Sequence, residues 1–490
     1  MSGGAVWIGV IIFILINLLV AFLSRRQTAT PDMAGYFLGN RKMNGFVSSL
    51  SYGSTTYSAF MMVGLAGLTY AGGVGALGFE LIYFMGVSLV ALFGPRFWAV
   101  GKTFGYVTPS EMLGDRYNNK WVATVVSLAS CIFLIPYSAV QLSGIGYLLA
   151  GMTGGAIPFT VGVVVATILA IVFSLFAGIR SVMWTDALQA LIMIVTSTIV
   201  VLLIVFELGG FGHFFQSLHQ SHPQALVVPG NGYFNFLTFL GLTVPWFFFS
   251  LSNPQVSQRL YMPSSLKSMK GMLIGFLVFG FVYTLVSVLW GFSAVLKFPS
   301  LATADLATPK LLSSGLVPPV LGIIVMIGIM AAAVSTIASI LLTLSSLVAR
   351  DVYGNMSRKQ TETLQLTVGK VVIPIISILA FLFSMLKVNL IGVLSVASSA
   401  GLIVAVPALI GAFFWKRGTA AGVITSVIVS GVMVILLELF KLKPLGLASG
   451  IWGIVVSSIL FVGVSLFTKA PVEKAKQFID VARSSLQVKS

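Results

Sequence analysis

Long apolar stretches separated by short polar loops run through the whole sequence. A helix of about 20 apolar residues is long enough to cross the hydrocarbon core of a bilayer. Thirteen such stretches lie near residues 4–24, 44–70, 75–95, 121–150, 157–177, 184–208, 235–252, 271–296, 318–348, 367–386, 389–415, 420–440 and 449–468. The pattern predicts an all-α polytopic membrane protein with about 13 transmembrane helices, forming a single transmembrane domain over residues 1–468.

Two of these stretches contain residues that interrupt a helix. The second holds a run rich in Ser and Thr around Gly53, and the seventh ends in SLSNP at Ser250–Pro254. Hydroxyl side chains compete for backbone hydrogen bonds, and proline disfavours helix geometry at the residue before it. Interrupted spans in corresponding places of two halves point to the binding site of a transporter.

The two interrupted stretches are five spans apart along the chain, at the second and seventh positions. A repeat of five spans has an odd length, so its second copy must run through the membrane in the opposite direction. We therefore expect an inverted five-helix repeat with broken helices. Its first copy would cover 44–208 and its second 235–415, with peripheral helices at 420–468.

A stripe of hydroxyl groups follows one side of the apolar helix expected over Met330–Tyr353. Ala332, Thr336, Ser339, Thr343 and Ser346 follow a 4-3-4-3 spacing that places them on one helix face, and the last four carry the hydroxyls. Ser335 adds a second hydroxyl beside Thr336. Unpaired polar groups in hydrocarbon cost several kcal/mol, so these hydroxyls need partners. Helix packing or a bound hard cation could supply them.

The charged residues are few and strongly one-sided. Only 8% of the 490 residues are charged, against roughly a quarter in soluble domains. If the N-terminus is outside and the thirteen spans alternate, 23 of the 28 Lys and Arg fall on one side, as cytoplasmic loops do. The net charge of +16 therefore indicates topology rather than a nucleic-acid partner. We expect a multi-pass plasma-membrane protein embedded in the lipid bilayer, with an outside N-terminus and a cytoplasmic C-terminus.

The basic tail at 469–490 is predicted to be cytoplasmic. It could lie on an anionic inner leaflet or form a disordered end. The sequence contains no visible cluster of a nucleophile, a base or metal ligands, and the single Cys131 lies inside a span. We therefore expect neither an enzyme nor a cofactor.

Five sequence blocks resemble one family of transporters. They are GYFLGNRKM at 35–43, GLAGLTY at 64–70, GIRSVMWTDALQALIM at 178–193, SNPQVSQR at 252–259 and AAAVSTIASILLTLSSLVARDVY at 331–353. In these blocks the chain resembles the sodium:solute symporter family, whose members carry proline, sugars, pantothenate, short carboxylates and iodide. The resemblance implies the same LeuT-like inverted-repeat fold that the helix breaks predict.

The resemblance also implies a sodium site between the second and ninth spans. Its ligands would be backbone carbonyls of Ser54, Tyr57 and Ala332 and the hydroxyls of Ser335 and Thr336. Asp186 matches an aspartate on the sodium exit route, although a helix-end charge in the headgroup region is an equal alternative. Thr56 stands where the proline branch has an aspartate, so the predicted site is less acidic.

A solute site follows from the same comparison. Its candidate residues are Glu80, Tyr137, Gln141, Trp246, Ser250 and Asn253. Glu80 matches a sugar-contacting glutamate, and could bind hydroxyls or an ammonium, or could simply reach water at the outer end of its span. Trp246 and Tyr137 match the proline branch, but Ser250 replaces a tyrosine of that branch, so proline specificity is not implied.

The sequence thus predicts a sodium-coupled symporter that imports a small organic solute by alternating access. The solute would be a carboxylate, an amino acid or a vitamin-like compound. Proton coupling through Glu80 or Asp186 is the main alternative, and a channel or a solute sensor is a further one. The partners expected are Na⁺, the solute and the lipid bilayer. The substrate, the stoichiometry and the oligomeric state are left open.

Overall fold

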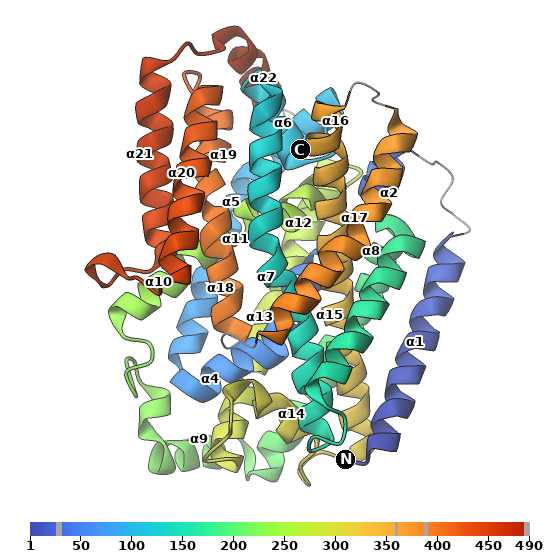
Figure 1. Ribbon diagram of the computed structural model, residues 1–490. Coiled ribbons are helices and arrows are strands. Elements are labelled where there is room, and N and C mark those ends of the chain that lie inside the picture. Colours follow the sequence, from blue (N-terminus) through green and yellow to red (C-terminus); the bar gives the residue numbers. More distant parts are fainter. Residues whose placement is uncertain (26–31, 358–360, 387–390, 485–490) are drawn as a thin grey trace.

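The structure is a computed structural model that describes residues 1–25, 32–357, 361–386 and 391–484 (Figure 1). Within these residues the chain is helical, with one isolated β-bridge between Met43 and Pro263. The helices up to the second break are α1 (Gly3–Arg25), α2 (Met33–Leu38), α3 (Gly45–Thr56), η2 (Phe60–Leu65), α4 (Ala66–Gly72), α5 (Gly75–Phe104), α6 (Pro109–Arg116), α7 (Lys120–Met152), α8 (Phe159–Glu207), α9 (Gly210–Ser221) and α10 (Phe236–Phe247).

The main helices that follow complete the bundle and the connections at its two ends. They are α11 (Phe249–Ser252), α12 (Pro254–Ser257), η4 (Gln258–Tyr261), α13 (Leu266–Lys297), α14 (Ala307–Leu312), α15 (Pro319–Leu347), η6 (Val348–Tyr353), α16 (Gly354–Met356), α17 (Glu362–Met385), α18 (Ile391–Leu402), α19 (Val406–Phe414), α20 (Ala420–Leu439), α21 (Ser449–Phe467) and α22 (Val472–Ser484).

Among the described residues, nine helices are long and apolar enough to cross a membrane alone. Four shorter apolar helices lie at Gly3–Leu19, Phe60–Gly72, Phe159–Leu175 and Phe236–Phe247. The four shorter helices overlap the other four apolar stretches of the sequence. The described residues thus form apolar helices wherever the sequence predicts a span, which confirms the all-α membrane architecture. The count of about 13 crossings stays a prediction.

Both predicted interruptions coincide with non-helical backbone. α3 ends at Thr56, Tyr57 has φ −94° and ψ 61°, and helical structure resumes at Phe60. In the seventh span Asn253 is extended (φ −82°, ψ 114°) between α11 and α12, as expected for a residue before proline. The repeat boundaries at 44–208 and 235–415 stay a prediction.

α15 is the central helix of the bundle. In the most apolar window of Pro319–Met356, 72% of residues are buried inside the protein, against 28% for Glu362–Met385 in α17. α15 packs against α8, α7, α17 and α3, while α17 and α21 leave large apolar side chains exposed on one side. An apolar surface of this kind suits lipid, so α15 is a core helix and α17 and α21 form the periphery.

The two ends of the bundle differ in their short helices. α2, α6, α16 and α22 gather at one end, and α9 and α14 lie at the opposite end with the N-terminus (Figure 1). The first end carries the loops in which the sequence analysis places most Lys and Arg. The assignment of this end to the cytoplasm stays a prediction based on charge.

The described part of the C-terminal tail is a docked amphipathic helix. α22 buries Ala475, Phe478 and Ile479 against α5, α6 and α19. The Phe478 ring lies 5.3 Å from that of Phe413, and Lys474 pairs with Asp115 at 2.8 Å. The disordered-end interpretation of the tail is therefore wrong for 472–484, while its contact with an anionic leaflet stays a prediction. The polar and basic composition of the tail conceals an apolar helix face, which α5, α6 and α19 cover.

This docking predicts how the tail responds to loss of its anchor. Phe478→Ala should free α22, because truncating a buried phenylalanine costs about 3–5 kcal/mol. Tryptic cleavage after Lys476 should then become at least about tenfold faster, measured by timed digestion of the purified protein. Phe467→Ala is the control, since that ring is 91% exposed and should leave the cleavage rate unchanged. Equal rates for the wild type and Phe478→Ala would contradict the docking.

Candidate ion and solute site

The broken helix α3 meets the hydroxyl stripe of α15 at the centre of the bundle. Thr336 Oγ1 donates a hydrogen bond of 3.1 Å to the carbonyl oxygen of Ser54. The hydroxyls of Ser54 and Ser335 lie 3.3 Å apart. All three side chains are buried. Three of the five predicted sodium ligands are therefore brought together, from segments about 280 residues apart in sequence.

The two remaining predicted ligands lie next to this contact. Tyr57 is the residue at which α3 breaks, and its backbone N–H donates to the Gly53 carbonyl at 2.7 Å. The Tyr57 carbonyl lies at the C-terminal end of α3, where backbone oxygens lack a hydrogen-bond partner within the helix and can bind an ion. Ala332 is fully buried one turn before Thr336 on α15. Ion coordination by these five residues stays a prediction.

Asp186 joins the same cluster from α8. Ser335 Oγ donates a short hydrogen bond to its Oδ1, and Ser51 Oγ donates one of 2.7 Å to its Oδ2. The Asp186 side chain is fully buried, and both alternatives for its role, an ion pathway and a helix-end charge, stay predictions. The carboxylate that the sequence places on an ion pathway lies one hydroxyl away from Ser54.

Arg259 is a buried partner of this cluster that the sequence analysis did not single out. Its Nη2 lies 3.2 Å from Asp186 Oδ2 and 2.6 Å from Ser339 Oγ. Arg259 follows the second helix break, in η4, so an ion pair ties the second break to α8 and α15. Arg259 is the last residue of the SNPQVSQR block, but its place in the sequence does not distinguish it from an ordinary loop charge.

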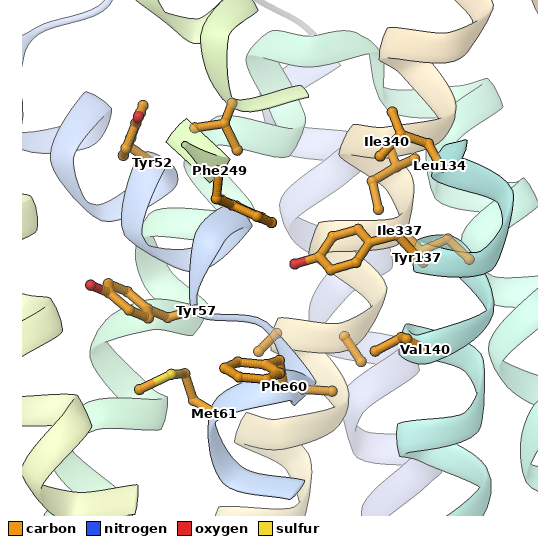
Figure 2. Packing of buried hydrophobic residues seen from close by; sticks show 14 of the residues in the cluster. Tyr52, Tyr57, Phe60, Met61, Leu134, Tyr137, Val140, Phe249, Ile337 and Ile340 are labelled. Atoms are coloured by element: carbon orange, nitrogen blue, oxygen red, sulfur yellow. The ribbon is translucent and has the colours of Figure 1, made fainter. Parts of the chain in front are cut away.

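Two of the predicted solute residues, Trp246 and Tyr137, belong to a cluster of aromatic side chains. Trp246 lies at its centre, with ring centroids at 4.7 Å for Phe249, 4.8 Å for Phe60, 5.4 Å for Phe79 and 5.9 Å for Tyr83. Tyr137 joins through Phe249, at 5.7 Å. These six residues are called the aromatic cluster below. Figure 2 shows Tyr137 reaching from α7 toward the break of α3, between Phe249 and Phe60.

Some polar side-chain atoms near the aromatic cluster have hydrogen-bond partners, and others have none among the described residues. Glu80 Oε2 accepts a hydrogen bond of 3.1 Å from Trp246 Nε1, while its Oε1 has no partner among the described residues. Neither polar atom of the buried Gln141 side chain has a described partner. Ser250 Oγ donates to the Tyr83 hydroxyl at 3.1 Å.

Asn253 is placed differently from the other solute candidates. Its side-chain nitrogen donates to the Phe249 carbonyl at 3.3 Å, and its oxygen accepts from Gln255 at 3.4 Å. These bonds hold the second break, so Asn253 is engaged in local structure. Phe60, Phe79 and Tyr83 are neighbours of Trp246 that the sequence did not reveal, because a single aromatic residue in an apolar span carries no distinguishing signal.

Comparison with known proteins gives the family. The sodium:solute symporter family pattern matches residues 36–430, which is most of the chain. The chain belongs to the sodium:solute symporter family. It is 26% identical over 460 residues to a sodium/pantothenate symporter of Escherichia coli (strain K12), covering 92% of this chain and 94% of that protein. It is also 26% identical over 493 residues to a sodium/proline symporter of Staphylococcus aureus, covering 95% and 93%.

Solved structures of sodium symporters share the fold of this family member. A Na⁺-coupled sialic acid symporter, in a substrate-bound outward-open state, matches with a TM-score of 0.80 and 20% identity, covering 95% of this chain and 98% of the other. Mhp1, a nucleobase-cation-symport-1 family transporter, matches with a TM-score of 0.59 and 12% identity, covering 93% and 100%. The predicted LeuT-like all-helical fold is confirmed.

The buried ion pair predicts strong coupling between its two members. Asp186→Ala or Arg259→Ala should each cost about 3–5 kcal/mol, because each leaves an unpaired buried charge. The double variant should cost clearly less than the sum of the two, as measured by unfolding in detergent. Glu111 and Arg350, whose side chains are 22% and 33% exposed, form the control pair and should couple by less than about 1 kcal/mol. Additive losses at Asp186 and Arg259 would contradict the assignment.

Proposed function

We propose that this protein is a sodium-coupled symporter that imports a small organic solute by alternating access. The observation that carries the proposal is the contact between the Thr336 hydroxyl and the Ser54 carbonyl at the break of α3. Family membership supports the same activity, because the relatives named above are sodium symporters.

Na⁺ would bind where these two oxygens meet. The proposed ligands are three backbone carbonyls and two hydroxyls, from Ser54, Tyr57, Ala332, Ser335 and Thr336. Neutral oxygens of this kind suit a hard monovalent cation, which does not require several carboxylates. A cation between α3 and α15 would take over both oxygens of the Thr336–Ser54 hydrogen bond. Occupancy by the ion would therefore fix the conformation of the break.

The break connects the ion site to the solute site over a very short distance in sequence. Tyr57, a proposed ion ligand, precedes Phe60 by three residues, and the Phe60 ring lies 4.8 Å from that of Trp246. Na⁺ that orders the break would also fix the position of Phe60 in the aromatic cluster. The resulting coupling is reciprocal, so the bound solute must raise the affinity for Na⁺ by the same factor.

The sodium gradient is sufficient to drive accumulation. One Na⁺ entering down about 100 mV releases about 2.3 kcal/mol, and a tenfold concentration gradient adds about 1.4 kcal/mol. Together these support roughly 500-fold accumulation of a neutral or zwitterionic solute per Na⁺. Asp186, which accepts from Ser335, would receive the ion on its way toward the cytoplasm.

Removal of the two hydroxyls tests the proposal. Ser335→Ala with Thr336→Ala should weaken ²²Na⁺ binding to the purified protein at least about tenfold, because two of five oxygens are lost. The double variant should also lose the rise in melting temperature that NaCl produces over KCl in the wild type. Thr343→Ala with Ser345→Ala, further along the same helix, is the matched control and should bind Na⁺ as the wild type does.

Two outcomes would contradict this assignment. One is unchanged Na⁺ binding in the Ser335→Ala, Thr336→Ala protein. The other is a wild type that shows no difference between NaCl and KCl but accumulates solute only under a pH gradient, which would make protons the coupling ion.

A further inference from the structure

We propose that the transported solute carries an ammonium group, which binds at Glu80 while the rest of the solute contacts the aromatic cluster. The inference rests on the proposed function and narrows its substrate to organic amines and amino-acid-like zwitterions. It sets aside solutes whose only charged group is a carboxylate.

The first observation is the incomplete hydrogen bonding of Glu80. The side chain is fully buried in α5, and the indole N–H of Trp246 satisfies only Oε2. An ionised carboxylate offers about four acceptor positions, and its burial is expensive unless a cation and further donors compensate it. Oε1 has no donor among the described residues, so this oxygen can accept a hydrogen bond from a bound molecule.

The second observation is that the described chain supplies no cation for this carboxylate. Its three ion pairs join Arg259 to Asp186, Arg350 to Glu111 and Lys474 to Asp115. Arg259 is the buried cation nearest in sequence to the second break, and Asp186, Ser51 and Ser339 engage its guanidinium. A bound ammonium group would supply the counter-charge that keeps the buried Glu80 carboxylate ionised.

The third observation is the chemistry of the surrounding rings. A cation within about 6 Å of an aromatic face is attracted by the ring quadrupole, and ammonium ligands are commonly held in boxes of such rings. Four ring centroids lie 4.7–5.9 Å from that of Trp246, so these rings pack directly on the indole that donates to Glu80. A cation bound at Glu80 would therefore lie beside aromatic rings. A carboxylate with a vacant acceptor at the edge of an aromatic cluster matches an alkylammonium group.

Gln141 extends the site along α7. It lies one turn after Tyr137, so the two side chains share a helix face. Both the amide oxygen and the amide nitrogen of Gln141 are buried without a described partner. The amide can therefore accept from a second N–H of the solute or donate to a hydroxyl or carboxylate at its other end. A solute with only a carboxylate would instead place a second negative charge in the space that holds Glu80.

Matched pairs of compounds test the charge requirement on the wild-type protein. The probes are L-proline against tetrahydrofuran-2-carboxylate, and phenethylamine against phenethyl alcohol. Binding is measured by thermal shift and calorimetry in NaCl and in KCl. We expect the ammonium compound of at least one pair to bind in a Na⁺-dependent manner. The compound without the ammonium should bind at least about 30-fold more weakly, because removing one partner of a buried charge pair costs about 2 kcal/mol or more.

Variants of two glutamates complete the test. Glu80→Gln keeps an oxygen that can accept from the Trp246 indole but removes the charge, so it should weaken binding of the ammonium probe at least about 30-fold. Glu438→Gln is the control, since Glu438 is exposed on α20 and accepts from Ser449. The matched pairs decide the question on the wild type even if Glu80→Gln does not fold.

The result that overturns the inference is equal binding by an uncharged or carboxylate-only partner, unchanged affinity in a folded Glu80→Gln protein, or no binding by either ammonium probe. The rise in melting temperature that Na⁺ produces without solute separates the two hypotheses. If that rise is present and the ammonium preference is absent, the inference alone fails. If the rise is absent, the proposed sodium coupling fails.

Discussion

The contact between the Thr336 hydroxyl and the Ser54 carbonyl is the interaction on which the rest of the structure depends. A backbone carbonyl released by a broken helix inside a membrane must find a partner within the protein, because lipid offers none. α15 supplies that partner through a hydroxyl on its central face. The same two oxygens could also coordinate a cation. At this position the Thr336–Ser54 hydrogen bond and a bound ion are therefore mutually exclusive.

The Asp186–Arg259 pair extends this constraint to the second break. Asp186 from α8 receives hydrogen bonds from Ser51 on α3 and Ser335 on α15, and Arg259 from η4 completes the set. Four elements therefore share one buried group of charges and hydroxyls. A buried network of this kind stabilises the fold only while all its members are satisfied. Movement of one broken helix must change the partners of the other, as alternating access requires.

Much of the fold follows from patterns in the sequence. Apolar length locates the helices, the Ser- and Thr-rich run and Pro254 locate the two breaks, and the 4-3-4-3 spacing places Thr336 on the face that meets α3. These features are local, so a single segment contains the information. The resemblance to a family added the proposed roles of Ser54 and Asp186, which no local pattern gives.

The residues that sequence reasoning missed act through distant partners. Arg259 looks like a loop charge until folding brings it to Asp186, and Phe60, Phe79 and Tyr83 look like ordinary apolar residues until they surround Trp246. The tail helix α22 has a polar composition, and only the tertiary structure supplies the surface that covers Phe478. Long-range complementarity of this kind is not encoded in spacing or composition.

The central claim is that a monovalent cation binds between α3 and α15. Anomalous diffraction from crystals soaked in Tl⁺, with and without an excess of Na⁺, tests it most directly. We expect one anomalous peak within coordinating distance of the Ser54 carbonyl and the Thr336 hydroxyl, and we expect Na⁺ to displace it. A map with no peak there, or with Tl⁺ bound elsewhere while Thr336 still donates to Ser54, would contradict the account.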